Sequence, residues 1–373
     1  MPLLGLATVQ VIDGASEQSL QGSCGLAKWC FSMLRLAAHS HLAGNADVLV
    51  LTNEEATVRS LCVRLPSQPP LRVLPLDLSL QAAIDGWSRV LNYSRTIWTR
   101  QLSLHAMYKL QVFRLTEYQA VLFTDADVNF FGDTAGIPPA STSRAGRSIN
   151  LALTAGLSSF LSSQQMLTAS ADFHSPINTA VMLLKPSLSI FARGLAVLER
   201  ARFDRLRGFD LIGRPRDVLA HLNTTTLWAE VSRTRMVDHN DWNFVGGHGC
   251  QGLFVYLFLI ELVRDPHQLP VGFPLGYAAR RKQHLGTLRV HHFRGHHKPW
   301  RAGARCPDYF RFLEHSTAHN QTQSHCWRML WEKRRCLEPR LSSAACTQCR
   351  AKGLASLCGT SRRDCMGTGV LVF

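Results

Sequence analysis

Residues 121–131, VLFTDADVNFF, combine the pattern of a buried strand with a pair of carboxylates. The first four residues are apolar or β-branched, which is typical of a strand that is buried on both faces. Asp125 and Asp127 stand two positions apart, so in an extended backbone they project from the same face and can converge on one cation. Hard divalent cations prefer such oxygen ligands, and the segment therefore predicts a metal site at the end of a central strand.

A second polar segment, VHHFRGHHKPW at residues 290–300, supplies groups that suit a metal-bound diphosphate. His292, Gly295 and Lys298 follow a short β-like run at residues 287–290. His292 offers an imidazole nitrogen, Gly295 permits close approach, and Lys298 offers a point charge to phosphate. Stabilising the charge that develops on a leaving diphosphate is usually a large catalytic contribution. We therefore expect the two segments to form one metal–diphosphate site.

The predicted ligand set favours manganese. Mn²⁺ accepts carboxylate and imidazole ligands together, whereas Mg²⁺ tolerates imidazole poorly. Asp125, Asp127 and His292 are thus predicted to hold Mn²⁺ or another divalent cation. An isolated Asp-x-Asp is common on solvated loops, so it is the apolar strand before it and the His-Lys segment after it that favour a metal site.

The rest of the sequence alternates strand and helix patterns in the way typical of a Rossmann-like α/β fold with a mostly parallel central sheet. With 373 residues, of which 46% are hydrophobic and 18% charged, the chain can bury one large core and a small appended module. Periodicity and breaker residues give the expected elements. Strands are expected at residues 4–12, 46–52, 71–76, 121–124 and 177–184, and helices at 26–39, 104–115 and 253–263.

Four segments, taken in order, resemble the retaining sugar-nucleotide glycosyltransferases of family 8, the group that contains glycogenin and the galactinol synthases. The segments are YKLQVFRLTEYQAVLFTDADV (108–128), INTAVMLLKPS (177–187), GCQGLF (249–254) and HHFRGHHKPW (291–300). The resemblance covers roughly residues 5–300. It implies a GT-A fold over residues 1–302, a divalent metal and a nucleoside-diphosphate sugar, expected to be a UDP-sugar, as the donor.

The resemblance also implies roles for the polar residues of the first and last segments. Asp125 and Asp127 match the metal-binding Asp-x-Asp of the family, and His292 matches its metal-binding histidine. Gly295 and Lys298 match its diphosphate contacts, and Asp125 belongs to the donor site as well as to the metal site.

Three further residues match positions near the donor sugar in similar enzymes. Lys109 falls where they have a lysine beside the sugar, Asn178 where they have an asparagine facing the sugar hydroxyls, and Gln251 where they have a glutamine beside the anomeric carbon. Lys109 and Asn178 also have ordinary alternatives. Lys109 alone reads as a surface lysine, and an Asn before a strand often only forms a turn.

The sequence departs from the family pattern in three places. Cys250 stands where the family has an aspartate that faces the sugar, and Ala180 stands where it has a glycine. The first strand is not followed by a clear Asn-x-x-Tyr for the uracil ring. We expect Cys250 to be a packed residue rather than a nucleophile, and His248 beside it to be an exposed loop histidine. Because Cys250 replaces a carboxylate that faces the sugar, an alternative function stays open. In this alternative, the chain is a catalytically silent protein of the same fold that binds a nucleotide sugar or a glycan.

The charge of the chain is strongly basic, with 41 Lys and Arg against 26 Asp and Glu and a formal net charge of +15. Such a surface attracts polyanions by long-range steering. The arginines are scattered, however, and the densest cluster, Lys333 to Arg335, lies near the C-terminus. This distribution argues against nucleic-acid recognition as the main function.

Cysteines concentrate at the C-terminal end, where residues 303–373 are expected to form a small Cys-rich module. Seven of the 11 cysteines lie in this part of the chain. Their density suggests disulfides. The alternative is a zinc site that uses Cys346 and Cys349 with Cys358 and Cys365. A basic adhesion or scaffold module built around this tail is a second alternative for the function.

Disulfides and the sequons at Asn92, Asn223 and Asn320 indicate the lumen of the Golgi apparatus or endoplasmic reticulum. The longest apolar run, residues 253–263, is too short to span a bilayer, and the N-terminus lacks the pattern of a signal peptide. Taken literally, these absences predict a cytoplasmic protein. We favour a lumenal enzyme whose membrane anchor is absent from this chain.

Together these patterns predict a metal-dependent, retaining hexosyltransferase that moves a sugar from a UDP-sugar to an acceptor hydroxyl on a glycan, a protein or a polyol. Gln251, Lys109 and Asn178 are the expected catalytic residues. No carboxylate is identified on the reacting face of the sugar. This favours an internal-return route, in which the acceptor attacks from the side of the leaving group, over a double displacement.

Overall fold

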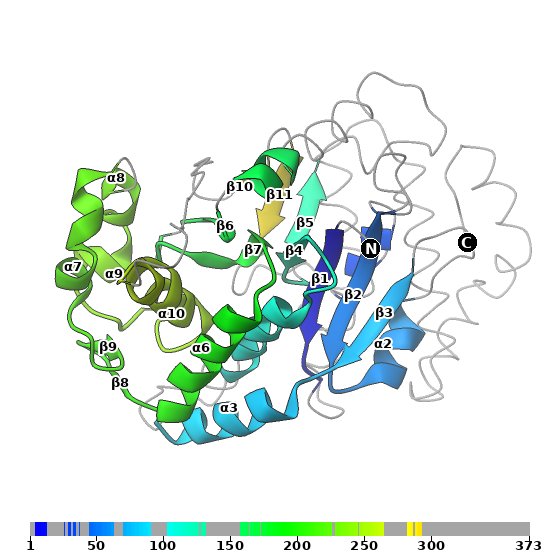
Figure 1. Ribbon diagram of the computed structural model, residues 1–373, viewed down its shortest axis with the longest axis horizontal. Helices are drawn as coiled ribbons and strands as arrows, with labels where there is room; N and C mark the ends of the chain where they lie inside the picture. Colours follow the sequence, from blue (N-terminus) through cyan, green and yellow to red (C-terminus); the bar gives the residue numbers. More distant parts are fainter. Residues whose placement is uncertain are drawn as a thin grey trace, which may run out of the picture.

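A mostly parallel sheet between two layers of helices forms the centre of the computed structural model (Figure 1). The strand order is β3-β2-β1-β4-β7-β6. Strands β3, β2, β1 and β4 are parallel, β7 runs antiparallel to β4, and β6 runs antiparallel to β7 and so in the direction of the first four. The strands are β1 (Leu4–Gln10), β2 (Ala46–Thr52), β3 (Leu71–Pro75), β4 (Ala120–Thr124), β6 (Leu167–Ser170) and β7 (Asn178–Leu184). The predicted α/β fold with a mostly parallel central sheet is confirmed.

The structure describes residues 4–12, 26, 29–30, 33–34, 37, 45–62, 70–90, 103–126, 128–131, 157–163, 165–171, 173–225, 228–244, 246–264, 282–285 and 288–292. The predicted Cys-rich module at 303–373 and its domain boundary lie outside these residues.

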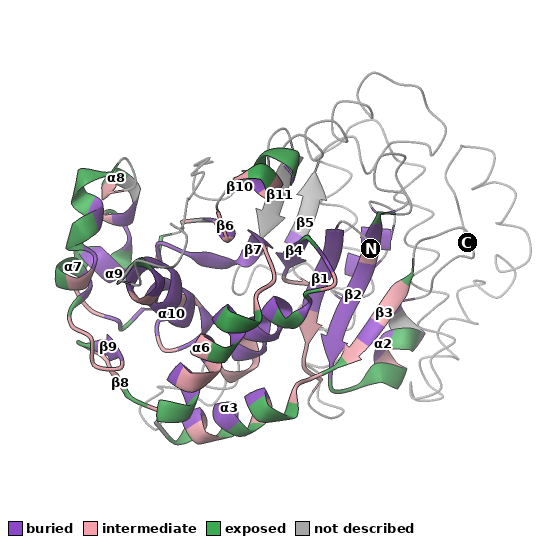
Figure 2. Ribbon diagram, viewed as in Figure 1, coloured by how far each residue is buried: buried purple, intermediate pink, exposed green. Residues whose placement is uncertain are grey.

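The sheet is buried on both faces because its strands are almost entirely apolar (Figure 2). Successive side chains of a strand point to opposite faces, so Leu6 and Ala7 of β1 belong to two different hydrophobic clusters. One cluster lies under the longer helices α3 (Leu78–Val90) and α6 (Leu188–Arg200). The other contains Val58 of α2 (Glu55–Leu61) and the helical residues between 26 and 37.

The expected helix over 26–39 agrees with the structure where it is described. The apolar positions that define its spacing are all helical and buried: Leu26, Trp29, Cys30, Met33, Leu34 and Ala37. The expected strands agree with β1, β2, β3, β4 and β7 to within two residues at each end. The predicted helix at 104–115 is helical from residue 103, but continues as the 3-10 helix η1 (Tyr108–Arg114).

Residues 203–244 form short elements beside the sheet, none of which the sequence pattern predicts. They are β8 (Phe203–Asp204), β9 (Gly208–Phe209), α7 (Pro215–Val218), η3 (Ala220–Thr224), α8 (Trp228–Val231) and α9 (Arg235–Asp238). The predicted core helix at 253–263 follows them as one buried helical run. It consists of α10 (Cys250–Val255), a π-helical segment η4 (Tyr256–Glu261) and α11 (Leu262–Arg264).

After β4, the chain enters a second, three-stranded sheet. Its antiparallel order is β10-β11-β5, and its strands are β5 (Val128–Phe131), β10 (Lys282–Leu285) and β11 (Leu288–His292). Figure 1 places β5 and β11 beside the end of β4. The expected β-like run at 287–290 is thus confirmed as part of β11 at residues 288–290.

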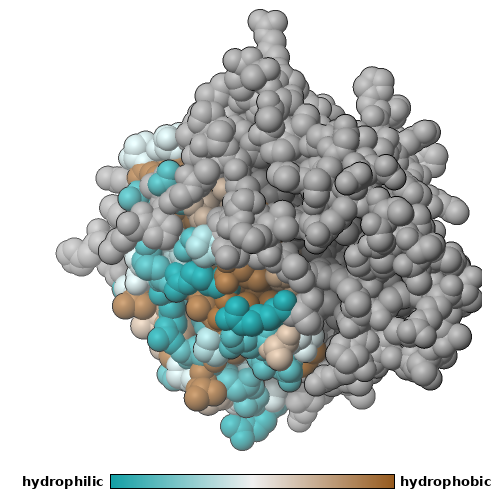
Figure 3. Space-filling view, turned by 90° about the vertical axis from the view of Figure 1, so that its right-hand side faces the viewer, coloured by the Kyte–Doolittle hydropathy of each residue, from teal (hydrophilic) through white to brown (hydrophobic). Residues whose placement is uncertain are grey.

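Within the described residues, no helix is long and apolar enough to cross a membrane. In the side view of Figure 3, hydrophilic residues cover most of the described surface, with hydrophobic residues between them.

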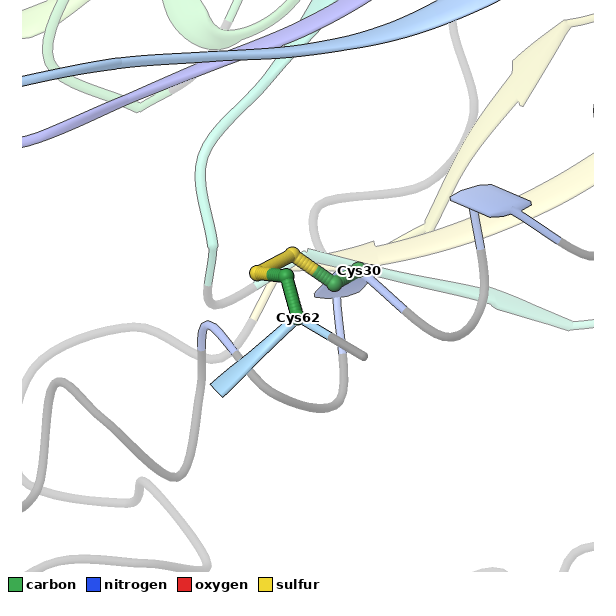
Figure 4. Close-up of a disulfide and its surroundings, with 2 residues drawn as sticks. All are labelled: Cys30 and Cys62. Carbon is green, nitrogen blue, oxygen red and sulfur yellow. A yellow bond between two sulfur atoms is a disulfide. The ribbon is translucent and has the colours of Figure 1, made fainter. Parts of the chain in front are cut away.

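A disulfide joins Cys30 to Cys62, the residue that directly follows α2 (Figure 4). The two sulfurs are buried in the cluster that covers one face of the sheet, with both residues at most 2% exposed. The bond closes a loop with a sequence separation of 32 residues that includes β2. The density of cysteines predicts disulfides only at the C-terminal end, so this bond is not one that the sequence pattern indicates.

We expect the double substitution Cys30→Ala and Cys62→Ala to lower the free energy of unfolding by about 3 to 4 kcal/mol, because loss of the cross-link frees a loop of this length in the unfolded chain. Urea unfolding of the oxidised wild type and of the double variant measures the difference. Equal midpoints for the two proteins would contradict the structural role of the bond.

Helix α6 packs closely against η1, the element that carries Lys109. A Cβ atom added at Gly194 of α6 would lie 2.5 Å from Cδ1 of Leu110, and Leu110 is fully buried and has little room to move. At Gly86 of α3, the nearest atom to an added Cβ is 3.7 Å away and belongs to the side chain of Arg89.

Gly194→Ala and Gly86→Ala are therefore expected to change stability in opposite directions. Alanine favours a helix over glycine by about 0.5 to 1 kcal/mol, which Gly86→Ala should gain. Gly194→Ala should instead destabilise by about 1 to 3 kcal/mol, since the added methyl overlaps a core side chain. Thermal unfolding of the two variants tests this pair, and a gain in stability for Gly194→Ala would disprove the close packing.

Candidate functional site

The candidate site lies at the carboxyl end of the parallel strands. β2 pairs with one side of β1, and β4 pairs with the other side. The strand order therefore changes direction between β1 and β4: β2 and β3 extend the sheet on one side, and β4, β7 and β6 extend it on the other. In open α/β sheets, ligands bind outside the carboxyl ends of strands at such a point. Asp125 directly follows β4 there, and its N–H donates to Ala180 O at 2.8 Å, which fixes its backbone against β7.

Asp125 begins a turn rather than an extended segment. Val128 N donates to Asp125 O at 3.0 Å, and β5 starts at Val128 in the second sheet. The chain turns at this point to pass from one sheet to the other, so the backbone after Asp125 does not continue β4 as an extended strand. The convergence of the two carboxylates on one cation stays a prediction. Asp127 itself lies outside the described residues.

Lys109 is a buried lysine, and the alternative that it lies on the surface is excluded. It is 8% exposed and comes from η1, whose other residues except Arg114 are also buried. Its Nζ lies 2.6 Å from Oδ1 of Asp125 and 2.8 Å from Oδ2. Nζ also donates to the carbonyl oxygen of Thr179 at 3.2 Å and to its Oγ1 at 3.4 Å.

Cys250 is a buried free thiol in the same group of residues. Burial raises its pKa to about 12, although Lys109 and a hydrogen bond with Thr179 oppose that rise in pKa. The thiol is therefore neutral at physiological pH. This agrees with the prediction that Cys250 is packed rather than nucleophilic.

Asn178 begins β7 close to this group and is 1% exposed. Its Oδ1 accepts from Ala180 N at 2.8 Å. The structure thus supports the turn-forming alternative for Asn178, in which its side-chain amide shapes the backbone at the start of a strand. The β6–β7 register shifts at the same place, between Ala169 and Ser170.

Gln251 occupies the first turn of α10, which packs against β7. Its side chain contacts Gly246, where φ is +84° and an added Cβ would lie 3.0 Å from Gln251 Oε1. Among the described residues, this buried Oε1 has no hydrogen-bond partner. A buried amide oxygen without a partner is unusual in a native protein and is a place where a ligand hydroxyl could donate.

The backbone of His292 lies beside the turn that begins at Asp125. In the antiparallel β5–β11 pair, His292 is opposite Val128, and His291 is opposite Asn129. Among the described side chains, no group of three or more His, Cys, Asp or Glu is placed to hold a metal. The predicted diphosphate contacts Gly295 and Lys298 lie outside the described residues. The metal set therefore stays a prediction.

His248 is not an exposed loop residue, so that expectation was wrong. Its Nε2 lies 3.1 Å from Ser103 Oγ, and its carbonyl oxygen accepts from Trp87 Nε1. Burial, followed by the nearby charge of Arg205, lowers the pKa of the imidazole. No sequence pattern indicates this contact, or the one between Thr179 and Lys109, because the partners lie far apart in the chain.

No family model and no curated protein matches this sequence. Among solved structures, the apo form of mouse xyloside xylosyltransferase 1 is similar to this chain, with a TM-score of 0.34 and 11% sequence identity. The match covers 74% of this chain and 84% of that chain. A similarity of this size assigns neither a family nor an activity.

We expect Cys250 to resist alkylation in the folded protein, because only the thiolate reacts and a thiol with a pKa of about 12 forms almost none at pH 8. The tryptic peptide 236–264 contains Cys250 and no other cysteine. Mass spectrometry of this peptide after iodoacetamide treatment should detect label only when guanidinium is present. Rapid labelling in the native protein would show that the thiol is accessible and ionisable.

Proposed function

We propose that this protein is a metal-dependent, retaining hexosyltransferase, which transfers a sugar from a UDP-sugar to an acceptor hydroxyl. The observation that carries the proposal is the β5–β11 pairing. It joins the segment containing His292 to the turn that begins at Asp125, at the edge of the sheet where ligands bind in this class of fold. The two segments predicted to form one site are thus neighbours in the backbone where residues 289–292 pair with residues 128–131.

The residues at this edge fit a divalent cation bound to diphosphate. Asp125, Asp127 and His292 would hold it, and their two carboxylates and one imidazole suit Mn²⁺. Asp125 is 27% exposed at its side chain, so a ligand can reach its carboxylate. The bound cation would supply charge stabilisation for the leaving diphosphate, and Lys298 and Gly295 would contact the diphosphate oxygens.

The residues around Lys109 would bind the sugar of the donor. Gln251 would accept a hydrogen bond near the anomeric carbon through its unpartnered Oε1. Asn178 would hold the start of β7 in place and face the sugar hydroxyls, while its own oxygen shapes the backbone. Lys109 would lie beside the sugar, as in the enzymes that the sequence resembles.

The proposed reaction keeps the configuration of the sugar. The bond between the anomeric carbon and the diphosphate oxygen breaks, the acceptor oxygen bonds to the same face, and the acceptor proton passes to the leaving phosphate oxygen. A double displacement needs a nucleophile on the opposite face. Cys250 is neutral and Gln251 is an amide, so the first turn of α10 offers no carboxylate for that role.

An oxidising compartment, the lumen of the Golgi apparatus or endoplasmic reticulum, is proposed as the location. Support comes from the Cys30–Cys62 disulfide, since such bonds are rare in the cytosol. Asn223, one of the sequon asparagines, is exposed in η3 and accessible to a glycan.

A binding protein without turnover is the second candidate, and the environment of Cys250 favours it. Where the similar enzymes have a carboxylate, this site has a neutral, buried thiol between Thr179 and Lys109. Such a site could keep the cation and the nucleotide sugar while transfer is lost. UDP binding without UDP release from any donor would support this candidate over the enzyme.

Asp127→Asn is expected to abolish UDP release from UDP-sugars in the presence of Mn²⁺, because it removes an oxygen ligand with full charge. Asp85→Asn, an exposed position of α3, removes the same charge away from the site and should retain wild-type activity. A panel of UDP-sugars with Mn²⁺, read by UDP release and by thermal shift, measures both effects. Undiminished turnover by Asp127→Asn would refute the metal assignment.

A further inference from the structure

Lys109 contacts both oxygens of Asp125, a residue predicted to bind the cation. The distances from Nζ are 2.6 Å to Oδ1 and 2.8 Å to Oδ2, so one ammonium group serves the whole carboxylate. Charge-assisted hydrogen bonds of this length are among the stronger contacts in proteins. The carboxylate thus already has a cation beside it.

The surroundings of Lys109 keep its ammonium at this place. Thr179 accepts from Nζ through both its carbonyl oxygen and its hydroxyl, and the ring of Phe123 lies with its centroid 5.3 Å from Nζ. The lysine side chain is 10% exposed, so little water is available to screen its charge. An unpaired ammonium in such a place would be unfavourable, which makes the contact with Asp125 the natural state without a bound cation.

A divalent cation on Asp125 would lie within a few ångströms of this ammonium. Like charges at such a distance in a partly desolvated site repel strongly. A diphosphate changes the balance, because its negative charges attract the cation and the ammonium together. The cation alone therefore meets an Asp125 whose charge Lys109 already balances. When a diphosphate is present, its negative charge attracts both the cation and the ammonium, so the two positive charges can be held together.

We propose that Lys109 is the internal counter-ion of Asp125, and that it makes metal binding depend on the diphosphate. The inference rests on the proposed metal–diphosphate site. It also states what Lys109 does at that site. Lys109 weakens the binding of the free cation and so strengthens the thermodynamic coupling between cation and nucleotide. By linkage, that coupling is the same whichever ligand binds first.

The test measures Mn²⁺ binding by calorimetry, with and without UDP, in the wild type and in Lys109→Gln and Lys109→Met. Both variants remove the charge, and glutamine keeps a polar group. Without UDP, we expect each to bind Mn²⁺ at least about tenfold more tightly than the wild type. The factor by which UDP tightens Mn²⁺ binding should fall correspondingly.

Lys185→Met is the matched control, because it removes one positive charge from another partly buried lysine. Lys185 follows the opposite end of β7 and bonds to the carbonyl oxygens of Leu161 and Ser163. Its Mn²⁺ affinity should equal that of the wild type. If a Lys109 variant is unstable, its melting temperature should still rise more on addition of Mn²⁺ than that of the wild type, since the cation replaces the missing charge.

The outcomes separate this inference from the proposed function. Mn²⁺ binding that is unchanged or weaker in both Lys109 variants, with binding intact in the wild type, overturns the counter-ion role and leaves the metal site in place. Failure of the wild type to bind Mn²⁺, with or without UDP, overturns the proposed metal site and this inference with it.

Discussion

A buried ammonium group needs a counter-ion, and the contact between Lys109 and Asp125 meets that need at the centre of the candidate site. The contact joins η1 to the end of β4. The hydrogen bonds from Lys109 Nζ to Thr179 join both elements to β7. Three elements are thereby fixed around one charge. The packing of α6 against η1 and the backbone bond from Asp125 to Ala180 hold the same elements from outside the site. The positions of Lys109, Asp125 and Thr179 therefore depend on one another.

The second sheet brings the backbone of His292, a proposed metal ligand, beside the turn that begins at Asp125. Because the chain turns at Asp125 and continues as β5, it leaves the central sheet at the carboxyl end of β4 and pairs with β11. That pairing carries His292 toward the acidic turn. The proposed metal–diphosphate site would take Asp125 from the end of β4 in the first sheet and His292 from β11 in the second. Its geometry therefore depends on both sheets together.

Much of the fold follows from local sequence. The residue ranges of β2 and β7, and the buried spacing between residues 26 and 37, agree with the structure because each segment is apolar on the faces that the core covers. The short elements between 203 and 244 were not predicted. They are too brief to show a period, and residues such as Trp242 are held by contacts with Gly208 and Gly213 rather than by propensity. The Cys30–Cys62 bond was not predicted either, because the number and spacing of cysteines do not show which pairs the fold brings together.

The sequence by itself determined an α/β fold, the strand that directly precedes Asp125, and the residue types that a cation and a diphosphate would need. Tertiary structure alone decided what those residues contact: that Lys109 is buried against Asp125, that Cys250 is a neutral thiol beside Thr179, and that His248 meets Ser103. The physical reason is range. Hydrophobic periodicity reports the environment of its own segment, whereas hydrogen bonds, desolvation and ion pairing depend on side chains that folding brings from distant parts of the chain.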